Sequence, residues 1–315
     1  MRRLLLILVP LVMLPWLLKS VKVDAAQQKQ AVAVAKPVAP AKPVAPAKPG
    51  EFAGEETCAL CHADVAKKFS SNPHSQLALM HGGKGVTCES CHGPGEAHVE
   101  SGGDVSKILQ LSKMPTKQVD ATCLGCHATS HPNFERSDHG KAGVGCTSCH
   151  SVHNSSTSPG AEAKLLKVDQ PKLCFSCHTD VKPAFSQPFH HKVNEGLLKC
   201  TDCHDTHGTF GNNQLRSTAD QNMICSKCHT ETRGPFVFEH AAVKAEGCLG
   251  CHTPHGSQNA RLLNVPNINQ MCNQCHSPVS AGTVHGMNAG SAEITPCIGC
   301  HTMIHGSNVN PAFIR

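Results

Sequence analysis

The sequence is poor in the large aromatic side chains from which most proteins build their cores. Only 3% of its 315 residues are Phe, Trp or Tyr; tyrosine is absent, and the single tryptophan, Trp16, lies near the N-terminus. An ordinary domain of this length buries many large side chains to offset the entropy lost when its backbone becomes ordered. The composition therefore excludes a conventional hydrophobic core and predicts that something other than side chains fills the interior.

The sequence also has no cysteine outside one repeated motif, because all 20 cysteines fall into ten copies of Cys-x-x-Cys-His, numbered 1 to 10 in chain order. Its cysteine pairs are Cys58 and Cys61, Cys88 and Cys91, Cys123 and Cys126, Cys146 and Cys149, Cys174 and Cys177, Cys200 and Cys203, Cys225 and Cys228, Cys248 and Cys251, Cys272 and Cys275, and Cys297 and Cys300. Its histidines are His62, His92, His127, His150, His178, His204, His229, His252, His276 and His301.

This motif is the attachment signature of haem c. Two thiols add to the vinyl groups of the haem, and the adjacent imidazole, here called the proximal histidine, ligates its iron. A disulfide framework or a set of zinc sites would also use paired cysteines, but neither requires a histidine after every second cysteine. The sequence therefore predicts ten covalently attached haem c groups.

The first 50 residues have the composition of an export signal followed by a spacer. A basic start at Met1–Arg3 precedes an apolar run at Leu4–Leu18, and small residues near Ala25 suit cleavage. This run is shorter than the roughly 20 residues that a membrane-spanning helix needs. The following residues are rich in Ala, Lys and Pro, which favours an extended, disordered chain. We expect a signal peptide at 1–25, a disordered tether at 26–50 and one decahaem cytochrome domain at 51–315.

Residues 51–315 provide only about 26 residues for each motif, which is too little chain to build a separate protein core around each macrocycle. The haems must then serve as the core. Gly, Pro, Asn and Ser are frequent between the motifs and disrupt regular structure. We predict a multihaem cytochrome c fold, mostly loops with short α-helices and little or no β-structure, arranged as one elongated row of haems.

Thirteen histidines lie outside the motifs and can supply a second, distal ligand to each iron. After odd-numbered motifs a histidine follows at about nine to thirteen residues, and after even-numbered motifs at three to six. The ten candidates are His74, His98, His139, His153, His191, His207, His240, His255, His285 and His305. Since these positions keep a fixed phase relative to the motifs, we predict bis-histidine ligation of all ten irons.

The length of the chain restricts which iron each distal candidate can reach. His207 follows the proximal His204 by three residues, which span at most about 10 to 11 Å. Such a segment cannot easily carry an imidazole around the macrocycle to the opposite face of the same iron. We therefore expect His153, His207, His255 and His305 to ligate haems attached at other motifs.

Three histidines, His81, His131 and His190, are not needed for this pattern. His191 is preferred to His190 because His191-Lys-Val-Asn-Glu-Gly resembles His240-Ala-Ala-Val-Lys-Ala-Glu-Gly. His81 and His131 are expected to face solvent.

The positive net charge of the whole chain does not describe the haem domain. The formal net charge of +5 includes seven net positive charges in the first 50 residues, so residues 51–315 carry a net charge of −2. Haem propionates add further negative charge. The composition therefore does not support nucleic-acid binding.

Ten motifs spaced by about 23 to 35 residues, with stretches such as Cys200-Thr-Asp-Cys-His-Asp-Thr-His-Gly and Cys248-Leu-Gly-Cys-His-Thr-Pro-His-Gly, resemble the MtrA/DmsE-type periplasmic decahaem cytochromes. The resemblance covers nearly all of the chain after the tether. It implies a periplasmic protein, associated with the outer membrane, that inserts into an outer-membrane β-barrel porin. The implied partners are periplasmic electron donors and an extracellular multihaem cytochrome.

Two other functions remain open at this point. A soluble periplasmic electron shuttle uses the same haem chemistry, and a barrel protein encoded beside this one would favour the conduit over the shuttle. A multihaem reductase needs an iron with an open position, often signalled by a lysine in place of the motif histidine. Every motif here ends in histidine, so we expect no enzyme activity.

Overall fold

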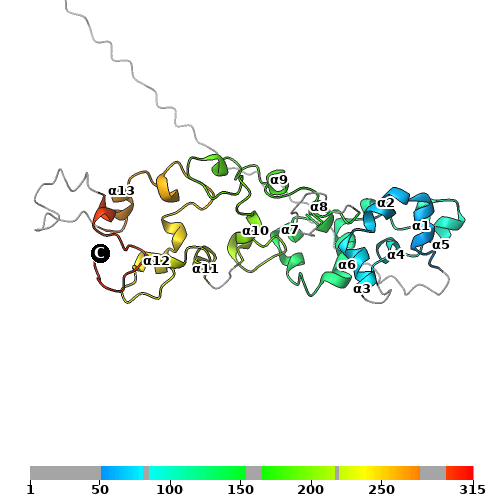
Figure 1. The fold of residues 1–315 in the computed structure, drawn as a ribbon, viewed down its shortest axis with the longest axis horizontal. Helices are drawn as coiled ribbons and strands as arrows, with labels where there is room; N and C mark the ends of the chain where they lie inside the picture. Colours follow the sequence, from blue (N-terminus) through cyan, green and yellow to red (C-terminus); the bar gives the residue numbers. More distant parts are fainter. Residues whose placement is uncertain (1–50, 81–84, 154–164, 217–219, 277–295, 315) are drawn as a thin grey trace, which may run out of the picture. The chain divides into compact units, whose positions relative to one another are not determined.

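The computed structural model describes residues 51–80, 85–153, 165–216, 220–276 and 296–314 (Figure 1). The expected signal peptide and tether at 1–50, together with His81 and His285, lie outside the described residues. The chain divides into two units, Met1–Pro43 and Val44–Arg315, and the description below concerns the second. In the described part of the chain, no helix is long and apolar enough to cross a membrane.

The described helices are short, and the longest, α6, has 12 residues. The α-helices are α1 (Glu55–Cys61), α2 (Ala63–Phe69), α3 (Pro73–Met80), α4 (Cys88–His92), α5 (Glu96–Glu100), α6 (Thr116–His127), α7 (Asp138–Lys141), α8 (Cys146–Cys149), α9 (Lys172–Phe175), α10 (Cys200–Cys203), α11 (Asn222–Cys225), α12 (Ala241–Ala245) and α13 (Ile268–Cys272). The 3₁₀ turns are η1 (Val105–Lys107), η2 (Leu111–Lys113), η3 (Phe134–Arg136), η4 (Ala184–Ser186), η5 (Asn212–Gln214), η6 (Thr230–Thr232), η7 (Cys248–Gly250), η8 (Ala260–Leu262) and η9 (Cys297–Gly299).

Each of the ten motifs begins inside one of these helical turns. A helical turn brings residues i, i+3 and i+4 to one face, which are the positions of the two cysteines and the histidine. In motif 6, for example, the backbone N–H of His204 donates to the Cys200 carbonyl at 2.9 Å. One turn of helix therefore suffices to present both thiols and the imidazole together, and the structure uses little more than that.

Side chains near the start of a motif helix join odd-numbered motifs to the even-numbered motif that follows. Asp120, Asn222 and Asn269 each lie three residues before the first cysteine of an odd-numbered motif. Their side-chain oxygens accept hydrogen bonds from the backbone N–H of Cys146, Cys248 and Cys297 at 2.8 to 2.9 Å. These bonds hold motifs 3 and 4, 7 and 8, and 9 and 10 side by side.

Isolated antiparallel bridges take the place of a sheet in the described residues. Three of them follow even-numbered motifs and pair a proximal histidine with a leucine downstream, as in His204 with Leu215 and His252 with Leu263. Two others join more distant segments, namely Phe189 with Ser257 and Phe238 with Ser307. The bridges thus close small loops around the motifs without forming a strand.

Very few hydrophobic side chains are buried in the described residues. They are Phe69, Val119, Phe134, Leu165, Phe185, Val193 and Ile224. Figure 1 shows the labelled helices of this unit in nearly chain order, from α1 and α5 at one end to α13 at the other. Short helices joined by loops, with no strand in the described residues, confirm the predicted multihaem cytochrome fold class.

Glycine is required where the loop after an even-numbered motif passes close to a neighbouring segment. A Cβ atom on Gly256 would overlap the backbone oxygen of Ala184, and one on Gly306 (φ +145°) would overlap the ring of Phe236. Both glycines directly follow a distal candidate, His255 and His305. The glycines therefore let the segments that carry these histidines pack against the preceding part of the chain.

We predict that Gly256→Ala lowers the free energy of unfolding of the holoprotein by about 1 to 3 kcal/mol, because the backbone around Ala184 has to move. The measurement is denaturant unfolding followed by haem absorbance. The control is Gly125→Ala, since nothing lies within 4 Å of a Cβ atom there. Equal stability of the two variants would contradict the prediction.

Candidate haem-ligating histidine pairs

The structure brings proximal and distal histidines together in nine pairs. The pairs are His62 with His98, His92 with His153, His127 with His74, His150 with His207, His178 with His139, His204 with His255, His229 with His191, His252 with His305 and His276 with His240. The two ring centroids of each pair are 5.9 to 6.4 Å apart. The proximal histidines of motifs 1 to 9 each belong to one of these pairs.

This spacing fits an iron between the two rings. A metal–imidazole bond is about 2 Å long and the ligating nitrogen lies about 1.1 Å from its ring centroid, so two imidazoles on opposite sides of one metal have centroids about 6.2 Å apart. Direct ring stacking would place the centroids closer, as in the 3.9 Å contact between His131 and His207. The residues present therefore match six-coordinate haem iron.

The pairs follow a skip-one rule that joins motifs two positions apart. We number each pair by the motif of its proximal histidine. The distal candidate of an even-numbered pair comes from the second motif downstream: His207, which follows motif 6, faces His150 of motif 4. The distal candidate of an odd-numbered pair comes from the second motif upstream, as with His139 after motif 3, which faces His178 of motif 5. Among the described pairs, only His62 with His98 departs from the rule.

The structure distinguishes the two adjacent histidines near motif 6. The ring of His191 faces that of His229 at 6.3 Å. Both nitrogens of His190 are occupied, because Nδ1 lies 2.6 Å from the Gln187 carbonyl and Nε2 lies 2.9 Å from the Glu195 carboxylate. His191 is thus the residue placed for ligation.

The expectation that His131 faces solvent is wrong. Its ring is half-buried and stacks on His207 at 3.9 Å, and it lies 6.0 Å from His127. The helix α6 ends at His127 and the chain turns back on itself, with the N–H of His131 donating to the His127 carbonyl. This turn carries the imidazole inward, which composition alone did not indicate.

In at least seven of the nine pairs, one imidazole donates its Nδ1–H to an oxygen of the protein, and we call this ring the anchored imidazole. In even-numbered pairs it is the proximal ring: His92 to Leu109, His204 to Asn213 and His252 to Arg261. In odd-numbered pairs it is the distal ring: His98 to Asp104, His74 to Asn72, His139 to Thr206 and His191 to Pro254. Such a bond fixes the tautomer and leaves Nε2 free to ligate.

Burial keeps several distal imidazoles neutral. It lowers the pKa of His153, His255 and His305, in each case helped by the proximal ring opposite. The pKa of His207 falls to about 4, first through burial and then through the neighbouring His131. A neutral imidazole is the form that binds a metal.

The cysteine sulfurs of successive motifs lie close together, and none of the 20 cysteines is in a disulfide. A hydrogen bond from the Cys146 thiol lowers the pKa of Cys123 to about 7 and raises that of Cys146. The same pairing with Cys248 lowers the pKa of Cys225 to about 6. The first cysteines of motifs 3 and 4, and of motifs 7 and 8, are therefore in contact, so haems attached to them begin side by side.

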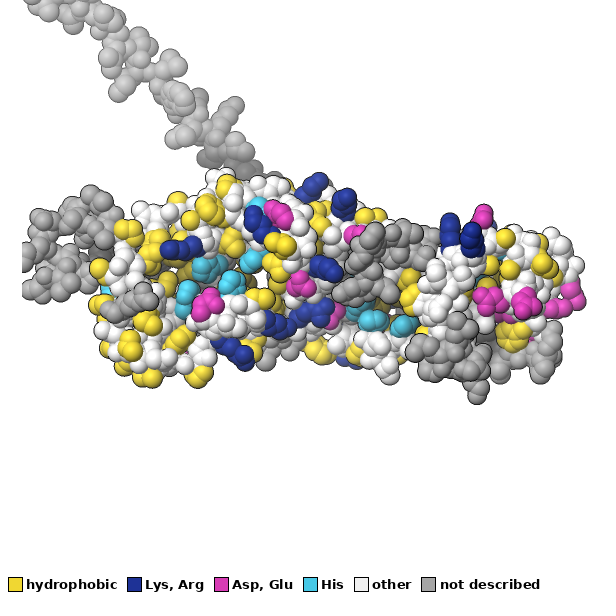
Figure 2. Space-filling view, in the orientation of Figure 1, with side chains coloured by type: hydrophobic (Ala, Val, Ile, Leu, Met, Phe, Trp, Pro, Cys, Tyr) yellow, Lys and Arg dark blue, Asp and Glu magenta, His cyan; other side chains and the backbone are white. Residues whose placement is uncertain are grey.

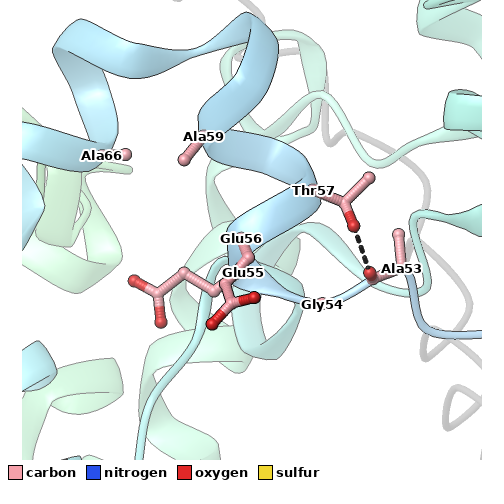
Figure 3. Close-up of a pocket in the computed structure, with 7 residues that line it drawn as sticks. All are labelled: Ala53, Gly54, Glu55, Glu56, Thr57, Ala59 and Ala66. Atoms are coloured by element: carbon pink, nitrogen blue, oxygen red, sulfur yellow. Dashed lines mark hydrogen bonds between the residues drawn. The ribbon is translucent and has the colours of Figure 1, made fainter.

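The surface is hollowed rather than closed around these groups. Figure 2 shows histidine side chains in clusters that open to the surface on this face. Beside α1 lies a hollow lined by Ala53, Gly54, Glu55, Glu56, Thr57, Ala59 and Ala66, in which the Thr57 hydroxyl donates to the Ala53 carbonyl at 2.7 Å (Figure 3). No histidine lines it, so it is separate from the imidazole pairs.

Comparison with known proteins supports the assignment of these groups to haem. The doubled CXXCH motif family matches residues 139–183, 190–234 and 240–281, and the cytochrome c554 and c-prime family matches residues 97–151. The multihaem cytochrome MtrA of Shewanella baltica is 31% identical over 274 residues, which cover 81% of this chain and 79% of MtrA. The chain belongs to the multihaem c-type cytochromes. This cytochrome therefore binds haem c covalently through its Cys-x-x-Cys-His motifs and transfers electrons.

Two further relatives match other shares of this cytochrome. The polyhaem cytochrome OmcC of Geobacter sulfurreducens is 25% identical over 294 residues, but these cover only 37% of OmcC. The c-type protein NrfB of Escherichia coli is 27% identical over 139 residues, or 39% of this chain. These matches cover 79% of this chain for OmcC and 72% of NrfB itself.

The doubled-motif matches have the period of the structural repeat. The three matched segments begin at His139, His190 and His240, and each contains one even-numbered and one odd-numbered motif. Nine of the ten predicted distal candidates lie opposite a proximal histidine, and His285 lies outside the described residues, but the sequence did not indicate the skip-one rule for odd-numbered motifs. A segment of nine to thirteen residues is long enough to reach its own iron, so length alone could not have shown that these histidines face another motif.

The place of His207 opposite His150 predicts an acid-sensitive fold. The unfolded chain binds a proton on this imidazole below about pH 6.5, whereas an imidazole that ligates a metal must stay neutral. Stability of the holoprotein should thus be highest above about pH 6.5 and fall as the pH is lowered below it. Urea unfolding of the holoprotein at a series of pH values measures it, and a midpoint that rises on acidification would contradict the prediction.

Proposed function

We propose that this cytochrome carries ten haem c groups, each with two histidine ligands, and passes electrons along the row from one end to the other. The observation that carries this proposal is the set of nine imidazole pairs with centroids 5.9 to 6.4 Å apart. Haem c, when bound, supplies the one-electron chemistry. The attachment cysteines and paired histidines hold it.

The tenth pair follows from the ligand inventory. The nine pairs cover motifs 1 to 9 and use nine of the ten predicted distal candidates, and the tenth candidate is His285. His301 is anchored like the other even-numbered proximal histidines, with Nδ1 2.5 Å from the Ala312 carbonyl. We assign His285, which lies outside the described residues, as the ligand opposite His301.

The contacts between neighbouring motifs give electrons a continuous route. First cysteines meet between motifs 3 and 4, and second cysteines lie close enough to interact between motifs 4 and 5, where Cys177 raises the pKa of Cys149 together with burial. Contacts of the same two kinds recur from motif 1 to motif 3 and from motif 5 to motif 10. Successive haems are therefore neighbours, and no motif is isolated from the row.

In the cell, we place this row in the bacterial periplasm and across the outer membrane. Such a location accords with the expected signal peptide and with the similarity to MtrA over most of both chains. A porin-type β-barrel would insulate the row, with periplasmic donors at one end and an extracellular multihaem cytochrome at the other. An exposed row of haems with few buried side chains has little protein of its own for insulation.

A soluble periplasmic shuttle is the second candidate. It uses the same haem chemistry and needs no barrel partner. A shuttle docks with donor and acceptor in turn, whereas a conduit connects them at the same time. Transport across a membrane separates the two functions.

The intact mass of the secreted protein under denaturing conditions should exceed that of the processed chain by ten haem masses, because every cysteine belongs to a motif. Electron paramagnetic resonance (EPR) of the oxidised protein should show low-spin ferric haem throughout, because each iron has two imidazoles. Fewer haems would contradict the stoichiometry. A substantial high-spin population that binds added ligands would instead favour a reductase.

Reconstitution with the candidate barrel in liposomes tests the conduit. An external reductant should reduce an enclosed redox dye much faster with the cytochrome than with the barrel alone. The matched control is Cys200→Ala with Cys203→Ala, which removes the haem of motif 6 and should slow transfer by interrupting the row in its middle. If the wild-type complex is no faster than the barrel alone, the shuttle is the correct function.

A further inference from the structure

We propose that Asn72 is a positioning residue that sets the orientation of the distal imidazole of haem 3 and ties it to the ligand segment of haem 2. The inference rests on the bis-histidine ligation proposed above. Asn72 is fully buried, although it lies in a turn between two short helices, α2 and α3. A buried amide needs hydrogen-bond partners for both its oxygen and its nitrogen, and these partners indicate its role.

The oxygen of this amide holds His74. Asn72 Oδ1 accepts from the backbone N–H of His74 at 2.9 Å and lies 3.1 Å from Nδ1 of the same residue. The imidazole must therefore carry its proton on Nδ1, which leaves Nε2 free on the side of His127. The ring planes of His74 and His127 are at 90° to each other, the largest angle among the nine pairs.

The nitrogen of the same amide reaches a second ligand segment. Asn72 Nδ2 donates to the carbonyl of Val152 at 2.6 Å, across 80 residues of sequence. Val152 directly precedes His153, whose ring faces His92 of motif 2. One side chain thus contacts the distal ligand of haem 3 with its oxygen and the residue before the distal ligand of haem 2 with its nitrogen.

The same link recurs twice further along the chain without an intervening side chain. His139, which faces motif 5, donates directly to the carbonyl of Thr206, the residue before His207. Likewise His191, which faces motif 7, donates to the carbonyl of Pro254, the residue before His255. We call this link the distal clasp. It ties the distal ring that faces an odd-numbered motif to the residue before the distal histidine that faces the preceding even-numbered motif.

Asn72 therefore bridges a gap that is closed directly in the later repeats. The position equivalent to Asn72 is Ser137, because both residues lie two positions before the distal histidine. Ser137 is also buried, and its hydroxyl accepts from the N–H of Gly140 at the start of α7. The serine hydroxyl thus accepts a backbone N–H at the start of the helix. Only the longer asparagine side chain also reaches the His74 imidazole and the Val152 carbonyl.

This comparison provides the test variant. Asn72→Ser should still cap α3, as Ser137 caps α7, but its shorter side chain cannot hold the His74 ring. Asn72→Asp keeps an oxygen at the Oδ1 position, so it should retain the ring orientation. The matched control is Asn222→Ser, since Asn222 also uses its oxygen and nitrogen for hydrogen bonds but only to backbone groups at Cys248 and Val243.

EPR reports the angle between the two ligand planes directly. In low-spin ferric haem, parallel imidazoles split the two iron d orbitals, dxz and dyz, that overlap the imidazole π systems, whereas perpendicular imidazoles leave these orbitals nearly degenerate and give a highly anisotropic signal. The wild-type spectrum should contain such a signal from haem 3. Asn72→Ser should lose one haem equivalent of it, while Asn72→Asp and Asn222→Ser should retain it, and intact mass must give ten haems for each variant.

The outcomes separate this inference from the proposed function. If the wild type has ten low-spin haems and Asn72→Ser has an unchanged spectrum, the role of Asn72 is refuted and the bis-histidine row stands. If the wild type lacks low-spin haems, the proposed function itself fails. If Asn72→Ser does not yield holoprotein, Asn72→Asp decides: loss of the anisotropic signal from a fully loaded Asn72→Asp protein would also refute the role of the oxygen.

Discussion

The fold depends on one constraint, which is that two imidazoles from separate parts of the chain must face each other about 6 Å apart. A proximal histidine is fixed next to its cysteines by one helical turn, so it contributes no freedom of its own. Its partner must come from elsewhere, and the observed partners come from motifs two positions away, such as His207 opposite His150. Long helices or a sheet would hold the motifs too far apart, and the described residues instead form short turns.

The hydrogen bonds of the described residues serve this arrangement more than they serve secondary structure. Side chains such as Asp120 and Asn222 hold neighbouring motifs together, and carbonyls such as those of Asn213 and Arg261 fix the tautomer of a proximal ring. These carbonyls lie in tight turns in which Asn213 and Arg261 adopt positive φ angles of 53° and 60°. The backbone accepts an unfavourable conformation there, because the carbonyl must point at the imidazole.

Much of the fold and of the set of histidine ligands could be predicted from the sequence. The physical reasons differ from one feature to another. The motifs, the absence of a conventional core and the phase of the distal histidines are properties of residue type and spacing. The partner of each distal histidine is a property of the path of the chain. Three residues are too short to bring His207 to its own iron, whereas the longer segment before His139 could reach either iron. The inward turn of His131 depends on where α6 ends.

The skip-one rule also explains why the two ends of the row differ from its middle. Under the rule, the odd-numbered iron of motif 1 would need a histidine from two motifs upstream, and the even-numbered iron of motif 10 would need one from two motifs downstream. Neither motif is among the ten that the printed sequence contains. The rule equally leaves two distal candidates without an iron, namely His98 after motif 2 and His285 after motif 9. At the first end, the structure resolves the mismatch by placing His98 opposite His62. The proposed pair of His285 with His301 resolves it in the same way at the other end.

Two motifs can therefore be inserted in the middle of such a row without leaving an iron or a ligand unpaired, as in repeat proteins whose terminal units alone are atypical. Lengthening by a single motif would change the parity of every ligand segment after it.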